Sequence, residues 1–253
     1  MGIRWFNDEQ MQWLSGLLLA KGVGPQELAA RLGADPGAGL IDRPLTHGQA
    51  SEMMPGSGRS PECDGMVRVG AHSEWSFALE YGAVRAQERL AEISQGGAEV
   101  FHYQPSPEHP PTQVAYAADG RVLVGFGLLE ENLRGGEQPD LLLADLIAAG
   151  VLTPDGRPHP GTDYRARKDR SLGVLERRFG LGLPQEVIGD LPLTAYAVRG
   201  VQPLATRREV IAQMSTWAAD HGITFDPHTE RVPIVLLEMH AQATGHPIRL
   251  PDQ

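Results

Sequence analysis

A chain of 253 residues, 41% hydrophobic and 21% charged, has the composition of a globular protein with one large core or two smaller ones. Its formal net charge of -10 disfavours sequence-independent nucleic-acid binding, and its single cysteine, Cys63, excludes an internal disulfide and a thiolate zinc site. No apolar run approaches the roughly 20 residues of a membrane helix, and no basic and apolar leader opens the sequence. We therefore expect a cytoplasmic protein that binds neither membranes nor nucleic acid.

Two short helices are predicted at the start of the chain. The second begins at Pro25 and ends at Gly33. The first is capped by Asn7 or Asp8 and ends at Gly22, and it carries its apolar side chains on one side, at Met11, Leu14, Leu17 and Leu18. Residues 34–65 then alternate prolines with glycines and hold few large apolar side chains, which predicts a long flexible loop, either a lid or an insertion.

The middle of the chain predicts an antiparallel sheet of about five strands. In the strand at 75–79 the side chains of Trp75, Phe77 and Leu79 alternate with smaller ones, which is typical of a strand with one buried face. The turn Asp119-Gly120 predicts a hairpin between the last two strands. The five strands are expected at 66–70, 75–79, 99–104, 113–117 and 122–126, with a helix at 84–94.

Helical patterns dominate after residue 139, so the fold class expected is α+β, with the sheet packed by helices and followed by a helical C-terminal part. Helices are predicted at 140–149, 167–179, 184–189, 206–220 and 232–243. These patterns predict an α+β domain at residues 1–152 and a mainly helical region at 153–253.

Three short blocks carry a resemblance to a known family. They are Arg4-Trp5-Phe6, the run from Val69 to Glu80, and the run from Leu175 to Leu181. Together they resemble the actinobacterial domain-of-unknown-function family 6461 over about residues 3–190. The resemblance implies a strand, a turn and a second strand followed by a helix and a meander. It implies no activity, cofactor or site residue.

Polar residues on the predicted strands are the candidates for chemistry. His72 and Glu74 are two apart on a strand, which places them on one face, and Glu80 continues that row. These three are the candidate catalytic residues of a polar sheet face, with the loop at 34–65 as a lid. If the strand carrying His102 is a neighbour, His72, Glu74 and His102 form a candidate metal site. The alternative is a polar sheet face without a ligand.

A basic run interrupts the acidic average. Arg165, Arg167, Lys168 and Arg170 are candidate binding residues for an acidic partner or a phosphate, and Trp75 is a further candidate at a binding surface. The alternative for the basic run is a solvated helix start with local ion pairs.

No catalytic motif and no cofactor fingerprint stands out, so the sequence favours a protein-binding function of the immunity type, which neutralises a partner without catalysis. Negative charge would steer a basic protein partner. Two alternatives stay open: an enzyme or small-ligand binder that uses the polar sheet face around His72 and Glu74, and a homodimeric scaffold or regulator joined through C-terminal helices. No cofactor is predicted.

Overall fold

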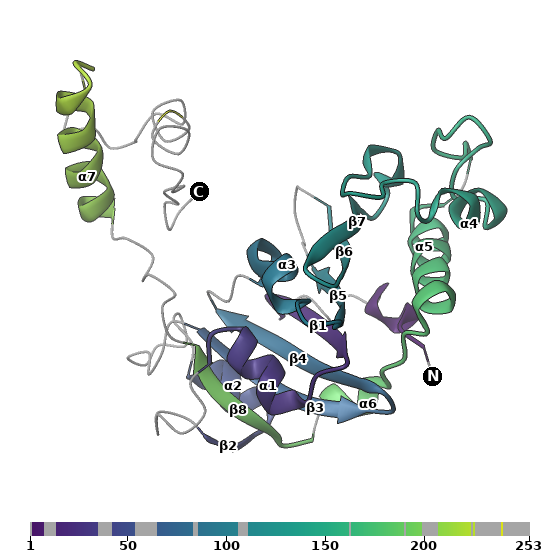
Figure 1. Ribbon diagram of the computed structural model, residues 1–253, viewed down its shortest axis with the longest axis horizontal. Helices are drawn as coiled ribbons and strands as arrows, with labels where there is room; N and C mark the ends of the chain where they lie inside the picture. The colour runs from purple at the N-terminus through teal and green to yellow at the C-terminus, as the bar shows by residue number, and fades with distance from the viewer. Residues whose placement is uncertain are drawn as a thin grey trace. The chain divides into compact units, whose positions relative to one another are not determined.

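The computed structural model describes residues 2–7, 14–34, 42–53, 65–82, 86–105, 111–161, 163–189, 191–198, 207–223, 225 and 239. Residues 1–201 and residues 202–253 form two separate compact units. Figure 1 shows the elements of the first unit gathered around one sheet. Within the described ranges, no helix combines the length and the apolar character needed to cross a membrane.

One antiparallel sheet of eight strands organises the first unit. Its strand order is β2-β8-β3-β4-β1-β5-β6-β7. The strands are β1 Gly16–Lys21, β2 Asp42–Leu45, β3 Gly65–His72, β4 Trp75–Gly82, β5 Glu99–Gln104, β6 Gln113–Ala118, β7 Arg121–Gly127 and β8 Leu193–Val198.

The five strands predicted from the sequence correspond to β3, β4, β5, β6 and β7, and the antiparallel α+β class is confirmed. The number of strands was wrong, because β1, β2 and β8 were missed. Residues 16–21 form β1 and not the end of a helix. In β1, Leu17 and Leu19 enter one core while Leu18 and Ala20 enter the other. A strand that is buried on both faces has a continuous apolar sequence. Such a sequence cannot be distinguished by periodicity from that of a short buried helix.

The loop prediction for residues 34–65 is corrected at residues 42–53, while residues 35–41 and 54–64 lie outside the described residues. Residues 42–45 form β2, and Thr46 caps the helix α2 His47–Glu52 through a reciprocal pair of bonds with Gln49. Capping of this kind satisfies backbone groups that would otherwise be exposed at the helix start. Pro44 lies in β2 at the edge of the sheet, which is the position where a strand tolerates proline.

The first face of the sheet carries the aromatic core. Phe77, Phe101 and Tyr103 point from the strands to this face and meet apolar side chains from four short elements and one long helix. Trp75 joins this core by donating from Nε1 to the carbonyl oxygen of Gly180, at 3.0 Å. The covering elements are η1 Arg4–Asn7, α2, α4 Leu143–Ala148, α5 Tyr164–Phe179 and α6 Gln185–Ile188. The short helix η4 Glu131–Leu133 follows β7 and adds no apolar side chain to this core.

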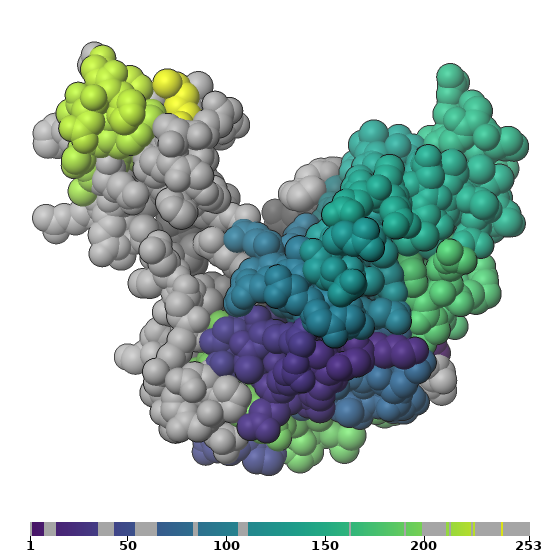
Figure 2. Space-filling view, viewed as in Figure 1, coloured from purple at the N-terminus to yellow at the C-terminus, as the bar shows by residue number. Residues whose placement is uncertain are grey.

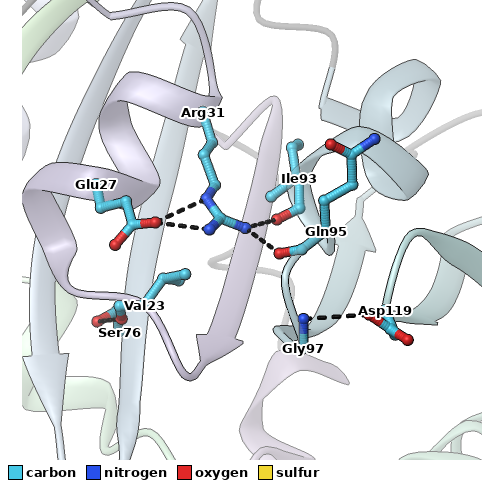
Figure 3. Close-up of polar contacts among 8 residues, drawn as sticks. All are labelled: Val23, Glu27, Arg31, Ser76, Ile93, Gln95, Gly97 and Asp119. Carbon is cyan, nitrogen blue, oxygen red and sulfur yellow. Dashed lines mark hydrogen bonds and ion pairs between the residues drawn. The ribbon is translucent and has the colours of Figure 1, made fainter.

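The second face of the sheet is covered at one end by helices α1 Pro25–Arg31 and α3 Leu90–Ile93, the latter preceded by η3 Ala86–Arg89. Arg31 joins these two helices. It donates to Oε1 of Glu27 in its own helix and to the carbonyl oxygens of Ile93 and Gln95, each at 2.7 Å (Figure 3). Figure 2 shows the two helical segments side by side on the surface. They lie toward the end of the sheet where β1 ends and β5 begins.

Four of the predicted later helices are confirmed as α4, α5, α6 and α7 Arg207–Asp220. Residues 193–198 form β8, which lies between β2 and β3 in the sheet. The first compact unit runs as far as residue 201. The helix predicted at 232–243 lies outside the described residues, apart from the exposed Met239.

Candidate functional site

A buried polar cluster lies on the second face of the sheet. Strand pairing places Glu80 of β4 opposite Gly16 of β1, and His102 of β5 opposite Leu18 of β1. Glu80 and His102 therefore lie on either side of β1 and on the same face. An ideal Cβ on Gly16 would lie only 2.8 Å from Cδ of Glu80. The missing side chain of Gly16 thus leaves the space into which the carboxylate extends toward His102.

Glu80 and His102 are close but do not form an aligned hydrogen bond. Oε1 of Glu80 lies 3.3 Å from Nε2 of His102, and each side chain is only 2% exposed. Neither atom has a hydrogen-bond partner. Buried polar atoms are nearly always paired, because an unpaired one costs about 1–3 kcal/mol. The two atoms are therefore close together and both without a hydrogen bond, which is unusual in a protein core.

Gln104 adds a third atom of the same kind. It lies two residues after His102, on the same face of β5, and at the level of Gly16. Its Oε1 is also buried without a partner. A carboxylate oxygen and an amide oxygen only accept hydrogen bonds, while an imidazole nitrogen accepts when it is unprotonated. Together the three atoms offer lone pairs to a group that donates hydrogen bonds or carries positive charge.

Replacing Gly16 by alanine should disturb this cluster. The new methyl group overlaps the carboxylate of Glu80, so we expect the free energy of unfolding to fall by about 1–3 kcal/mol. Urea unfolding of the purified variant measures the loss. Combining G16A with Glu80→Ala should recover most of it, since the overlap is then removed.

Gly48 provides the matched control for that substitution. It lies in helix α2, and a Cβ built there meets no atom within 4 Å. Gly48→Ala should leave stability unchanged or raise it slightly, by about 0.5–1 kcal/mol, because alanine favours a helix over glycine. Equal losses in both variants would show that the overlap with Glu80 has no effect of its own.

The structure does not bring the predicted metal residues together. His72 pairs with Trp75 at the hairpin between β3 and β4, so it lies on the first face, while His102 lies on the second. Glu74 is in the turn of that hairpin, where its exposed carboxylate meets Nζ of Lys21 at 2.7 Å. Across the described ranges no group of three His, Cys, Asp or Glu side chains could hold a metal ion. Cys63 lies outside the described residues.

Trp75 and the basic run are placed differently from the surface patch expected. Trp75 is only 2% exposed and belongs to the aromatic core. Arg167 points inward from α5, whereas Arg165 is exposed and Lys168 is half-buried. Arg170 is exposed and donates to the carbonyl oxygen of Gly150. The four basic residues therefore do not share one surface.

Arg167 belongs to a buried ion pair that joins α5 to the segment after β7. It lies 2.6 Å from Oε2 of Glu131 and also donates to the carbonyl oxygen of Leu129. Ser171 donates to the other carboxylate oxygen of Glu131 at 2.7 Å, as does the backbone nitrogen of Leu129 at 3.0 Å. These bonds hold Leu129 at a φ of 82°, a conformation that a leucine rarely adopts.

Arg68 forms a second buried cluster, on the first face of the sheet. It is fully buried and donates to the carbonyl oxygens of Leu45 and Leu191 and, at 2.7 Å, to the hydroxyl of Tyr81. Burial raises the pKa of Tyr81 to about 12, so this hydroxyl stays neutral and accepts from Arg68. Arg68 thereby ties β3 to β2 and to the segment before β8.

The sequence offered Glu80 and His102 as candidates but did not join them. Their pairing depends on β1 lying between β4 and β5, and β1 was not recognised as a strand. The signal that could have found them is Gly16 directly before an apolar run, because a glycine in a strand often marks a close approach.

Comparison with known proteins places the chain in a family without assigning its chemistry. A family model described as a family of unknown function, DUF6461, matches residues 3–192. No curated protein and no solved structure matches the chain. The matched residues include all three members of the polar cluster and end directly before β8. Because the match covers most of its length, the chain belongs to the DUF6461 family.

Proposed function

We propose that this protein binds a small ligand at the cluster of Glu80, His102 and Gln104, and that the ligand donates hydrogen bonds or carries positive charge. The observation that carries the proposal is the set of three buried atoms, Oε1 of Glu80, Nε2 of His102 and Oε1 of Gln104, that have no hydrogen-bond partner. This is the small-ligand alternative raised by the sequence, centred on different residues.

The arrangement favours ligand binding over a purely structural role. A structural ion pair in a core gains its stability from aligned hydrogen bonds that satisfy both partners. Glu80 and His102 are buried without such alignment, which leaves the cost of their burial uncompensated within the described part of the chain. A bound donor or cation would supply the missing interactions.

Ligand-dependent stability provides the test. The metal-free full-length chain is heated with separate additions of methylamine, guanidinium, imidazole, Zn²⁺ and Mn²⁺. A ligand present at about 100 times its Kd stabilises the folded state by about 2.7 kcal/mol, which shifts Tm by several degrees. We expect at least one probe to raise Tm, and Glu80→Gln, which keeps the shape of the side chain, to abolish the shift.

His72→Ala serves as the matched control, because His72 lies on the opposite face of the sheet. It should keep the full shift. Should every probe leave Tm unchanged, or should Glu80→Gln respond like the unmodified chain, this site would not be a ligand site.

The protein-binding function expected from the sequence remains a second candidate. Two large apolar side chains favour it: Leu133, at the end of η4, is 68% exposed, and Tyr164, at the start of α5, is 73% exposed. They lie on the two elements that Arg167 and Glu131 join. A protein partner would cover such side chains, because exposed apolar surface is typical of sites that bind proteins.

A paired substitution separates this candidate from the ligand site. The double variant Leu133→Ser, Tyr164→Ser should fold normally, because both side chains are exposed, and should lose any protein that co-purifies in stoichiometric amount with the unmodified chain. Glu80→Gln should keep that protein. Co-purification that survives the double variant would assign the interaction to another surface.

A further inference from the structure

We infer that the ligand of the polar cluster is a divalent first-row metal ion of the zinc type, held by Nε2 of His102 and Oε1 of Glu80, with Oε1 of Gln104 as the third ligand. The inference rests on the proposed function and names the ligand class of the same site. It differs from the metal site expected from the sequence, since only His102 is common to both.

The distance between the two stronger ligands carries the argument. Zinc lies about 2.0–2.1 Å from an imidazole nitrogen and about 2.0–2.2 Å from a carboxylate oxygen. Two such atoms on one tetrahedral ion are therefore about 3.4 Å apart. The distance between Nε2 of His102 and Oε1 of Glu80 is 3.3 Å.

The absence of a hydrogen bond between the two groups agrees with that distance. An imidazole and a carboxylate at 3.3 Å would ordinarily align as a hydrogen bond, and these do not. Ligands of a common ion point at the ion and not at each other. Two ligands of one ion would show this separation without a hydrogen bond between them.

The backbone makes the convergence possible. Glu80 and His102 are on strands that are not neighbours, and β1 passes between them. Gly16 leaves the second face of β1 bare at this level, so that the carboxylate can lie across the strand. Gln104, on the same strand and face as His102, supplies a further oxygen.

The chemistry of the three atoms selects the class of ion. Imidazole nitrogen favours zinc and its first-row neighbours, while Ca²⁺ and Mg²⁺ take sets of oxygen ligands. The single charge of Glu80 offsets part of the charge of a divalent ion, and the amide of Gln104 adds none. A site with three protein ligands also keeps a position for water or substrate.

The test is metal binding by the full-length chain after removal of metal with a chelator. Zn²⁺ and Co²⁺ are titrated separately and heat release is measured, with Cys63→Ser included to remove binding by the thiol. We expect one equivalent to bind, and Glu80→Gln and His102→Asn each to weaken binding more than about 100-fold, since each removes a direct ligand. His72→Ala should bind as the unmodified chain does.

A measurement on the unmodified chain keeps the test independent of how the variants fold. One equivalent of Zn²⁺ should shift the imidazole nitrogen resonances of His102 in NMR spectra and leave those of His72 unchanged. Binding that leaves His102 unaffected, or no binding with a Kd below about 10 μM, would overturn the inference. Methylamine or guanidinium could raise Tm in a way that Glu80→Gln abolishes, while neither metal binds there. The metal assignment would then be wrong and the proposed function would be supported. If no probe gives a shift that depends on Glu80, both the metal assignment and the proposed function are wrong.

Discussion

Replacing Glu131 by alanine should lower the free energy of unfolding by about 3–5 kcal/mol, because it leaves Arg167 as a buried charge without its partner. The carboxylate also accepts from Ser171 and from the backbone nitrogen of Leu129, and both donors would lose their acceptor. Urea unfolding at constant pH and ionic strength measures the change. The whole sheet should still unfold in one transition, at a lower urea concentration, since the ion pair joins α5 to the segment that follows β7.

Two variants serve as controls for this prediction. Glu92→Ala breaks the exposed ion pair with Arg89 and should change stability little, because solvent screens such pairs. The double variant Glu131→Leu, Arg167→Met removes both charges together and should recover most of the loss. A loss below about 1 kcal/mol in Glu131→Ala would mean that water or another group replaces the carboxylate.

Replacing Arg68 by methionine should lower the free energy of unfolding by about 2–4 kcal/mol, because one buried and one part-buried carbonyl oxygen and one hydroxyl lose their donor. Removing the buried charge offsets part of that cost, since none of the three acceptors is a carboxylate. Arg68→Lys should recover little of the loss, because one ammonium group cannot reach three acceptors that the planar guanidinium meets in different directions.

Hydrogen exchange localises that effect. Arg68 bonds to the carbonyl oxygen of Leu45, so the amides of β2 should lose protection in Arg68→Met before those of β5 and β6 do. Arg121→Met is the control, since Arg121 forms only an exposed ion pair with Glu137. Equal loss of protection in every strand would instead indicate a global effect without a local connection to β2.

The sequence predicted β4 because its large apolar side chains share one face. In β4 the large side chains Trp75, Phe77 and Leu79 alternate, and each enters the aromatic core. β1 could not be recognised in the same way, because its leucines are divided between two cores. β8 was missed because the helices around it dominate the local pattern, and its identity as a strand comes from pairing with residues more than 120 positions earlier.

The sequence predicted residues of the candidate site, but not that they lie together. Glu80 and His102 were each candidate residues. Their proximity depends on strand order, which a local sequence pattern does not determine. His72 and Glu74 were expected to share a strand face, and the turn through Ser73, at a φ of 54°, instead ends the strand between them. Arg167 was expected at the surface, and a buried carboxylate 36 residues earlier is what draws it inward.

The position of β8 has a consequence for the way the chain is made. β3 pairs with β8 along one edge, and β8 is the last strand of the sheet in sequence order. While the ribosome is still adding residues before 193, that edge of β3 has no neighbour and presents open backbone groups to other nascent chains. Synthesis at about 5–20 residues per second leaves this edge open for several seconds. Protection of β3 by a chaperone during that interval would therefore favour correct assembly over aggregation.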